Sequence, residues 1–138
     1  MPSFVDTNVL VYAEDSAAGR KREIARDLVV RLWSEGSGVV SVQVLQELYV
    51  TLTRKLRHPL SPARAAEIVN QYLTWRVVDN DGDLLVAAMA LHQRASVSLW
   101  DALVVEAATA ARCDRLYSED FNPRQRFGSV EIVNPFPR

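Results

Sequence analysis

A chain of 138 residues with a mass of 15.5 kDa is the size of one domain and can bury a substantial hydrophobic core. Its formal net charge of −1 gives no overall positive field, so any binding to nucleic acid must come from a local basic patch. The single cysteine, Cys113, excludes an internal disulfide and suits a reducing cytoplasm. The longest uninterrupted apolar stretch, residues 84–91, is too short to cross a bilayer. We therefore expect one cytoplasmic domain over residues 1–138, without membrane association.

Short runs with strand composition alternate along the chain with longer segments whose apolar residues recur at helical spacing. In chain order the sequence predicts a strand at residues 4–5, a helix at 20–33, a strand at 38–40, helices at about 41–57 and 61–75, a strand at 77–78, helices at about 81–95 and 98–112, and strands at 116–117 and 130–133. Ser41, Ser61 and Ser98 are suited to cap the helices that they begin. Because alternating strands and helices form βαβ units, we predict a three-layer α/β fold in which helices flank a mostly parallel central sheet.

Two acidic residues follow predicted strands. Asp6 comes directly after residues 4–5, and Asp120 lies shortly after residues 116–117, with Glu119 beside it. Functional groups of parallel sheets gather at the carboxyl ends of the strands, which favours a binding or catalytic role for both acids. Each also has a structural interpretation, because Asp6 can cap the helix that comes after it and Asp120 can belong to a polar turn.

Two more acidic residues lie beside apolar faces of predicted helices. Glu47 borders the apolar stripe of its helix, where an unpaired carboxylate is costly, although it could also be half exposed or paired with Arg54 or Lys55. Asp101 lies in the first turn of a helix that is apolar nearly all round, so its charge faces the interior unless something compensates for it. Ser98, three residues earlier, offers a helix-capping role for Asp101 as the alternative.

These four acids together predict a site for a hard divalent cation. Carboxylates that are forced together repel one another and resist ionisation unless cations neutralise them. Carboxylate oxygens suit Mg²⁺ or Mn²⁺. A typical zinc site is not expected, because the chain offers only His58, His92 and Cys113 as nitrogen or sulfur ligands.

At these residues the sequence resembles the PIN-domain family and, within it, the VapC-type toxin ribonucleases of type II toxin–antitoxin systems. The resemblance covers essentially the whole chain and rests on four short motifs that occur in order: Asp6-Thr7-Asn8, Leu45-Gln46-Glu47-Leu48, Trp100-Asp101-Ala102-Leu103 and Ser118-Glu119-Asp120-Phe121. It implies a PIN-like α/β/α fold and the activity of a metal-dependent endoribonuclease, which hydrolyses RNA phosphodiester bonds with a metal-activated water.

The resemblance also assigns roles to individual residues. It implies that one or two Mg²⁺ or Mn²⁺ ions are held by the catalytic residues, which are Asp6, Glu47, Asp101 and Asp120. It leaves open whether Glu119 or Asp120 is the closer ligand. The supporting residues that it implies are Thr7, Asn8, Ser118 and Glu119. Proteins of this type commonly form homodimers and are held inactive by a small antitoxin, so the expected partners are RNA, a second copy of the chain and a VapB-like antitoxin.

Basic and aromatic residues complete the set of candidates. Arg124 and Arg126 lie shortly after Asp120, and we interpret them as contacts to RNA phosphates. The basic run at residues 20–26 is interpreted as a solvated helix face. Trp100, like the other large aromatic side chains, is interpreted as part of the core or of a dimer interface rather than as a surface on which bases stack.

Two alternative functions remain open from the sequence. One is a PIN-type nuclease that processes RNA without an antitoxin, and the single-domain length favours the toxin over it. The other is a catalytically inactive PIN-like module that binds a partner. The presence of all four acids argues against this second alternative, because clustered charge is costly to keep without a use.

Overall fold

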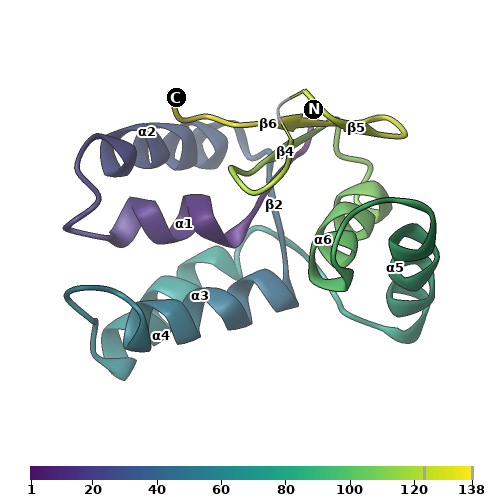
Figure 1. Ribbon diagram of the computed structural model, residues 1–138. Helices are drawn as coiled ribbons and strands as arrows, with labels where there is room; N and C mark the ends of the chain where they lie inside the picture. Colours follow the sequence, from purple (N-terminus) through teal and green to yellow (C-terminus); the bar gives the residue numbers. More distant parts are fainter. Residues whose placement is uncertain (123, 138) are drawn as a thin grey trace.

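A computed structural model describes residues 1–122 and 124–137 of the chain (Figure 1). The helices are α1 (Thr7–Glu14), α2 (Arg20–Glu35), α3 (Val42–Arg54), α4 (Pro62–Tyr72), α5 (Gly82–Arg94) and α6 (Leu99–Ala110). The strands are β1 (Ser3–Val5), β2 (Gly38–Ser41), β3 (Arg76–Val78), β4 (Arg115–Tyr117), β5 (Arg126–Phe127) and β6 (Val130–Val133). The alternation of strands and helices confirms the predicted α/β class.

The described strands form one sheet in the order β3-β2-β1-β4-β6-β5. Neighbouring strands run parallel from β3 to β6, whereas β5 pairs with β6 in the antiparallel direction. Near the middle of the sheet, Phe4 of β1 lies between Val39 of β2 and Leu116 of β4. Because β1 and β4 point the same way, the residues that come after them emerge at the same edge of the sheet.

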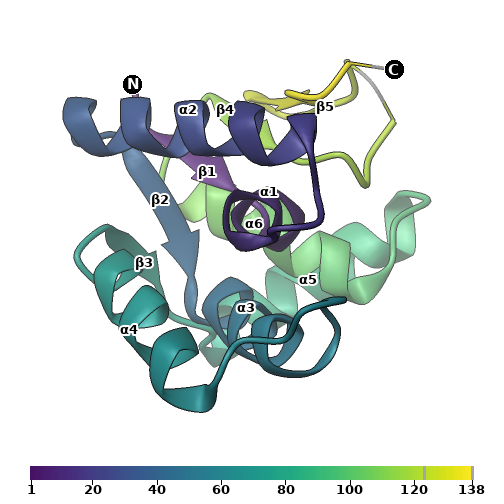
Figure 2. The same ribbon diagram turned by 90° about the vertical axis from the view of Figure 1, so that its left-hand side faces the viewer.

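Helices cover both faces of this sheet, as Figures 1 and 2 show. α1 and α2 pack together on one side, and α5 and α6 pack together on the other, where α6 contacts β2, β4 and β6. α3 and α4 form a further antiparallel pair, and α3 also packs against α1. The inner residues of α6 are buried, as its apolar composition predicts: Ala102, Leu103, Val104, Val105, Ala107 and Ala108. The layered arrangement therefore matches the sequence prediction.

The predicted helix caps are confirmed. The Ser41 hydroxyl accepts a hydrogen bond from the backbone N–H of Val44 at 3.2 Å, and the Ser98 hydroxyl accepts one from the backbone N–H of Asp101 at 3.0 Å. Ser61 caps α4 in the same way. These bonds satisfy N–H groups that have no partner within the first turn of a helix, and they fix where α3, α4 and α6 begin.

Some boundaries differ from the prediction. α3 ends at Arg54, before the predicted residue 57, and the loop after it supplies a partner to the last turn, because the backbone N–H of Leu60 donates to the carbonyl of Leu52 at 2.8 Å. The two-residue strand β5 is not among the predicted strands, since so short a segment carries little pattern of its own. Among the described residues, none of the helices has the length and apolar content needed to cross a membrane.

Candidate active site

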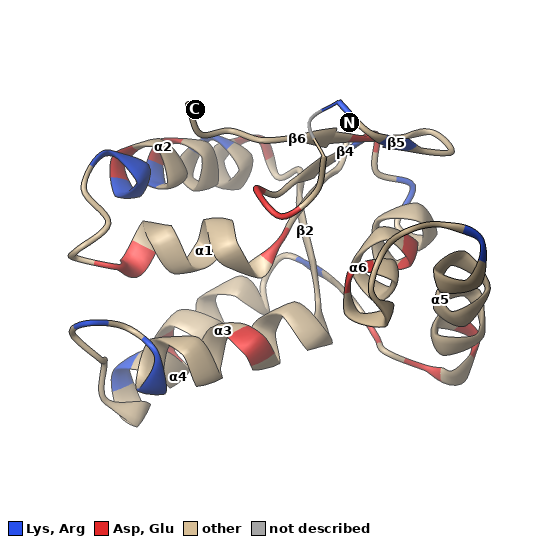
Figure 3. Cartoon of the chain, viewed as in Figure 1, with Lys and Arg blue, Asp and Glu red and all other residues tan. Residues whose placement is uncertain are grey.

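The carboxyl edge of the sheet carries the acidic residues singled out from the sequence. Asp6 comes directly after β1, and Asp120 lies in the loop after the neighbouring strand β4. Glu47 extends from the middle of α3, and Asp101 extends from the first turn of α6. In Figure 3 the acidic segments of α3 and of the loop after β4 lie on either side of the start of α1. Four segments that are distant in sequence therefore bring negative charge to one region.

Asp6 is the most deeply buried of these acids, with 5% of its surface exposed. It is the N-cap residue of α1, and its Oδ1 accepts a hydrogen bond from the backbone N–H of Thr7 at 2.8 Å. Burial raises the pKa of Asp6 to about 7, against the opposing hydrogen bonds from Ser118 and Thr7. The negative charges of Asp120 and Glu47 raise this pKa further. The Asp6 carboxylate thus caps a helix and also lies where a cation would stabilise its charged form.

Ser118, which is completely buried, connects Asp6 to the loop after β4. Its hydroxyl donates a hydrogen bond to Oδ2 of Asp6 at 2.8 Å. The same hydroxyl oxygen accepts bonds from Nδ2 of Asn8 at 3.2 Å and from the backbone N–H of Asp120 at 3.1 Å. One small side chain therefore fixes both the orientation of the Asp6 carboxylate and the backbone that presents Asp120. Hydrogen bonds thus join Asn8 and Ser118, two of the supporting residues that the resemblance implies, to the segment around Asp6 and Asp120.

Glu47 has an exposed side chain, but its two carboxylate oxygens each accept a hydrogen bond. The hydroxyl of Thr7 donates to Oε2 at 3.2 Å, and Nε2 of Gln43 donates to Oε1 at 2.7 Å. The bond from Thr7 brings Glu47 next to the start of α1, one residue from Asp6. Gln43 is a supporting residue that was not predicted from the sequence. Its position one turn before Glu47 is the signal that could have revealed it, because side chains four residues apart on a helix are neighbours.

Asp101 is partly buried at the start of α6. Burial raises the pKa of its carboxyl group, and the negative charges of Asp120 and Glu47 also raise it, whereas a hydrogen bond with Ser98 lowers it. Asp101 therefore contacts the capping residue Ser98, as the helix-capping alternative predicts, and also lies within the electrostatic influence of Asp120 and Glu47. The influence of Asp120 on the pKa values of both Asp6 and Asp101 places these three carboxylates in one electrostatic environment.

Glu119 and Asp120 are adjacent in sequence but differ in their contacts. Oε2 of Glu119 forms a salt bridge with Nζ of Lys21 at 2.9 Å, and Oε1 accepts a hydrogen bond from the Tyr12 hydroxyl at 2.5 Å. The side chain of Glu119 is thus turned towards α1 and α2. Asp120 is exposed and interacts with the charges of Asp6 and Asp101. Of the two acids, Asp120 is therefore the one available to a cation at this edge.

The four acids do not form a finished ligand set. Within the described residues, no three His, Cys, Asp or Glu side chains lie close enough together to hold a metal ion. Mutual repulsion favours separation of the carboxylates, and Glu47 is held by its bonds to Thr7 and Gln43. The chemistry of the set nevertheless fits a hard divalent cation, because its donors are all carboxylate oxygens and the buried Asp6 resists ionisation without a positive charge nearby.

Arg124 and Arg126, the two arginines interpreted from the sequence as RNA contacts, are not held beside the acids by any contact between described residues. Arg126 lies on β5 opposite Glu131, and Glu131 lies opposite Arg115 at the start of β4. Arg126 is therefore near the amino ends of the parallel strands, at the opposite edge from Asp6. It also lies 3.8 Å from the Glu131 carboxylate. Arg124 is exposed in the loop before β5 and has a positive φ of 62°.

Comparisons with known proteins bear on this arrangement. No curated protein sequence matches the chain. Among solved structures, VapC20 of Mycobacterium tuberculosis, described as a sarcin–ricin loop cleaving toxin, aligns with a TM-score of 0.63 and 22% identity over 86% of this chain and 89% of that chain. A toxin–antitoxin complex from Klebsiella pneumoniae aligns with a TM-score of 0.71 and 18% identity over 97% of this chain and 98% of that chain.

A third similar structure is VapBC2 from Rickettsia felis, solved with a DNA fragment from its promoter. It aligns with a TM-score of 0.69 and 16% identity over 97% of this chain and 98% of that chain. At such identities the likeness demonstrates a shared fold, which confirms the PIN-like architecture predicted from the sequence. The sequence itself matches the PIN domain over residues 3–126, most of its length. The chain therefore belongs to the PIN-domain family.

Proposed function

We propose that this protein is a metal-dependent endoribonuclease, that it is the toxin of a toxin–antitoxin pair, and that it acts in the cytoplasm. The observation that carries the proposal is the buried carboxylate of Asp6 at the carboxyl edge of the sheet, with its pKa raised to about 7 and three further acids around it. An acid that resists ionisation in this way is costly unless a cation uses it. Support for RNA cleavage comes from the similar fold of VapC20, which is described as a sarcin–ricin loop cleaving toxin.

In this proposal Asp6, Glu47, Asp101 and Asp120 hold one or two Mg²⁺ or Mn²⁺ ions. A bound ion of this kind supplies a water of lowered pKa and stabilises negative charge on the phosphate. Ser118 orients the Asp6 carboxylate, and Thr7 and Gln43 orient that of Glu47. Such partners keep the acids in place while the ion is absent and set their direction when it binds.

The proposal includes a VapB-like antitoxin and a second copy of the chain as partners. Support for a protein partner comes from the toxin–antitoxin complexes among the similar structures. It also comes from an almost wholly apolar groove between α3 and α4, which includes Leu45, Tyr49 and Leu73. Tyr49 and Leu73 expose 38% and 51% of their surface there, and exposed apolar patches commonly mark protein interfaces.

The first experiment incubates total bacterial RNA with the purified protein and Mg²⁺ or Mn²⁺ and maps new 5′ ends by sequencing. Asp6→Asn and an EDTA control run in parallel. We expect new ends only with the wild-type chain and metal, because the variant and the chelator each remove part of the site. If the wild-type chain binds metal by calorimetry but produces no new ends, the assignment as a ribonuclease is wrong for this RNA pool, and a partner-binding role replaces it.

A further inference from the structure

Trp100 is the most exposed tryptophan of the chain. It exposes 65% of its surface, compared with 38% for Trp33 and 9% for Trp75. It lies immediately before Asp101 in the first turn of α6, and its backbone carbonyl accepts a hydrogen bond from Nε2 of Gln43 at 3.5 Å. An indole exposed to this extent beside a group of acids has no role in the core and leaves a large flat apolar surface open to a ligand.

Trp100 stands at one end of a groove of about 500 Å³ that runs along α3. Its lining consists of one face of that helix together with the indole: Gln46, Glu47, Val50, Thr51, Lys55 and Trp100. Lys55 is at the other end, nine residues or roughly 13 Å of helix axis from Gln46. Glu47 belongs to both the groove and the proposed metal site, so the groove leads directly from the acids.

We propose that this groove binds single-stranded RNA beside the cleaved bond, with one base stacked on the indole of Trp100 and a backbone phosphate against the ammonium group of Lys55. The inference rests on the proposed ribonuclease function and adds to it the part of the surface that holds the substrate. The exposure of the indole excludes the core position considered for Trp100 from the sequence, and the dimer-interface alternative is one of the outcomes of the test below.

The groove at Trp100 differs in its charged side chains from the groove between α3 and α4. The latter is lined almost wholly by apolar atoms and suits a protein partner. The groove at Trp100 instead ends at Lys55, which forms no salt bridge with any described residue. In a chain with a net charge of −1, a lysine that has no salt bridge to the described residues, at the far end of a groove that begins at the acids, offers a phosphate the local attraction that the whole molecule lacks. An aromatic surface paired with a cation is the combination by which proteins bind single strands without reading their sequence.

The test measures binding separately from cleavage by using the Asp6→Asn chain as the parent. Short fluorescein-labelled, mixed-sequence oligoribonucleotides are titrated with this parent and with versions that also carry Trp100→Ala, Trp100→Phe or Lys55→Met. Val30→Ala and Arg94→Met are the matched controls, because Val30 exposes 63% of its surface on α2 and Arg94 is exposed at the end of α5. Neither control residue lines the groove.

Trp100→Ala is expected to weaken binding by about tenfold or more, as loss of one stacked base does, and Trp100→Phe to retain part of the affinity. Neither change should alter the dependence of affinity on salt. Lys55→Met should reduce the slope of log affinity against log salt concentration by about 0.7, because one phosphate contact of a single strand is lost. The two controls should leave both affinity and slope unchanged.

A scan of oligoribonucleotides with one abasic position each identifies the stacked base. When this base is missing from the oligoribonucleotide, Trp100→Ala should cause no further loss of affinity, because the base that stacks on Trp100 is already absent. Undiminished affinity in Trp100→Ala, or an equal loss in Val30→Ala, overturns the inference. The inference is also overturned if light scattering shows that Trp100→Ala dissociates an oligomer while the RNA affinity per protomer stays the same. That result would assign the surface around Trp100 to a protein interface.

The failure of this inference can be told from failure of the proposed function by assaying cleavage with the wild-type chain in parallel. Cleavage together with binding that is insensitive to Trp100 overturns the groove alone. Binding that depends on Trp100 without cleavage by the wild-type chain supports the groove and overturns the catalytic assignment. Absence of both binding and cleavage overturns the two together.

Discussion

The carboxyl ends of the parallel strands form one edge of the central sheet, and their amino ends form the opposite edge, here called the amino edge. The side chains around these two edges differ in kind. At the carboxyl edge, Asp6 is buried with a raised pKa, and polar side chains hold the surrounding acids. At the amino edge, Trp33, Tyr72 and Trp75 form an aromatic cluster with ring centroids 5.0 to 5.2 Å apart. One edge of the same sheet therefore keeps charge that opposes folding, and the other contributes aromatic packing that favours it.

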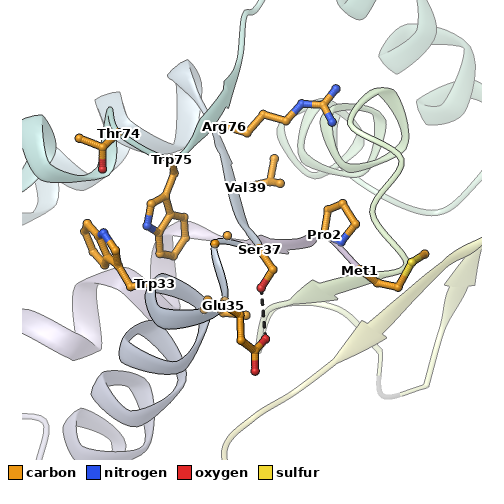
Figure 4. A pocket seen from close by; sticks show the side chains of 12 residues that line it. Met1, Pro2, Trp33, Glu35, Ser37, Val39, Thr74, Trp75 and Arg76 are labelled. Atoms are coloured by element: carbon orange, nitrogen blue, oxygen red, sulfur yellow. Dashed lines mark hydrogen bonds between the residues drawn. The ribbon is translucent and has the colours of Figure 1, made fainter.

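Figure 4 shows the amino edge from close by, with Trp33 and Trp75 side by side and Arg76 beyond them. A cavity of about 440 Å³ is present here, and Gly38 at the start of β2 is one of its lining residues. The indole of Trp75 packs so closely on Gly38 that a methyl group at this position would lie 2.5 Å from a ring carbon. Absence of a side chain at residue 38 is thus a condition for the aromatic packing. Stability and activity should therefore respond to mutations at different ends of the sheet.

The largest effect is expected from Asp6→Asn on RNA cleavage. The change removes a negative charge from the centre of the acidic group while keeping the shape of the side chain and its bond to Thr7. The cleavage rate should fall by more than about a hundredfold, beyond the loss typical for a mere partner of a metal ligand. Initial rates on an RNA mapped with the wild-type chain measure this, with circular dichroism as the check on folding. A variant that cleaves as well as wild type removes Asp6 from the site.

Gly38→Ala tests the opposite edge and should reduce the free energy of unfolding by about 3 kcal/mol, because the added methyl group overpacks the region around Trp75. Urea denaturation measures the change. Gly82→Ala is the matched control, since a methyl group there meets nothing within 4 Å. The cleavage rate of Gly38→Ala at a temperature where it is fully folded should equal that of wild type. A loss of rate without a loss of stability contradicts the division between the two edges.

Ser118→Ala should weaken metal binding and cleavage by about ten- to hundredfold, which is the usual cost of removing a group that orients a metal ligand. The variant loses the hydrogen bond to Asp6 and the one that supports the backbone of Asp120. Isothermal titration with Mn²⁺ gives the affinity, and Ser118→Thr, which keeps the hydroxyl, should recover part of it. Equal metal affinity in Ser118→Ala and wild type contradicts the role assigned to this hydroxyl.

The pH dependence of stability should show the smallest effect. Because the pKa of Asp6 is raised in the folded chain from 3.8 to about 7, the folded state binds more protons than the unfolded state between these values. In EDTA, the contribution of Asp6 to stability should therefore be most favourable at low pH and should decrease as pH rises towards 7. Asp6→Asn should remove that decrease, and at pH 8 it should be more stable than wild type by about 1 kcal/mol or more. Thermal unfolding at pH 5 and pH 8 tests this, and a variant less stable than wild type at pH 8 contradicts it.

The sequence predicted the positions of the acids to the extent that local rules determine them. Asp6 and Asp120 were placed at one edge because both come after strands, and parallel strands end at the same edge. The caps at Ser41 and Ser98 were predicted because an orphan N–H at a helix start has few other partners. Features that follow from a residue's own helix or strand, or from the parallel direction of the strands, could therefore be predicted before the fold was known.

The remaining details depend on which elements become neighbours. Glu119 and Asp120 cannot be told apart from sequence, because the partners of Glu119 are on α1 and α2. Arg126 is close to Asp120 in sequence, but the antiparallel pairing of β5 carries it towards the other edge of the sheet. The exposure of Trp100 could not be predicted either, since its helix is apolar on most sides.

The hydrogen bond between Asp6 and Ser118 joins residues 112 positions apart. During synthesis β1 emerges first, but its neighbour β4 can insert beside it only after most of the chain has been made. Closing so long a loop costs conformational entropy and slows folding relative to local contacts. A growing chain on the ribosome therefore carries Asp6 without the loop that holds Ser118 and Asp120. The acidic site can therefore form only after residue 120 has been synthesised, late in the production of the chain.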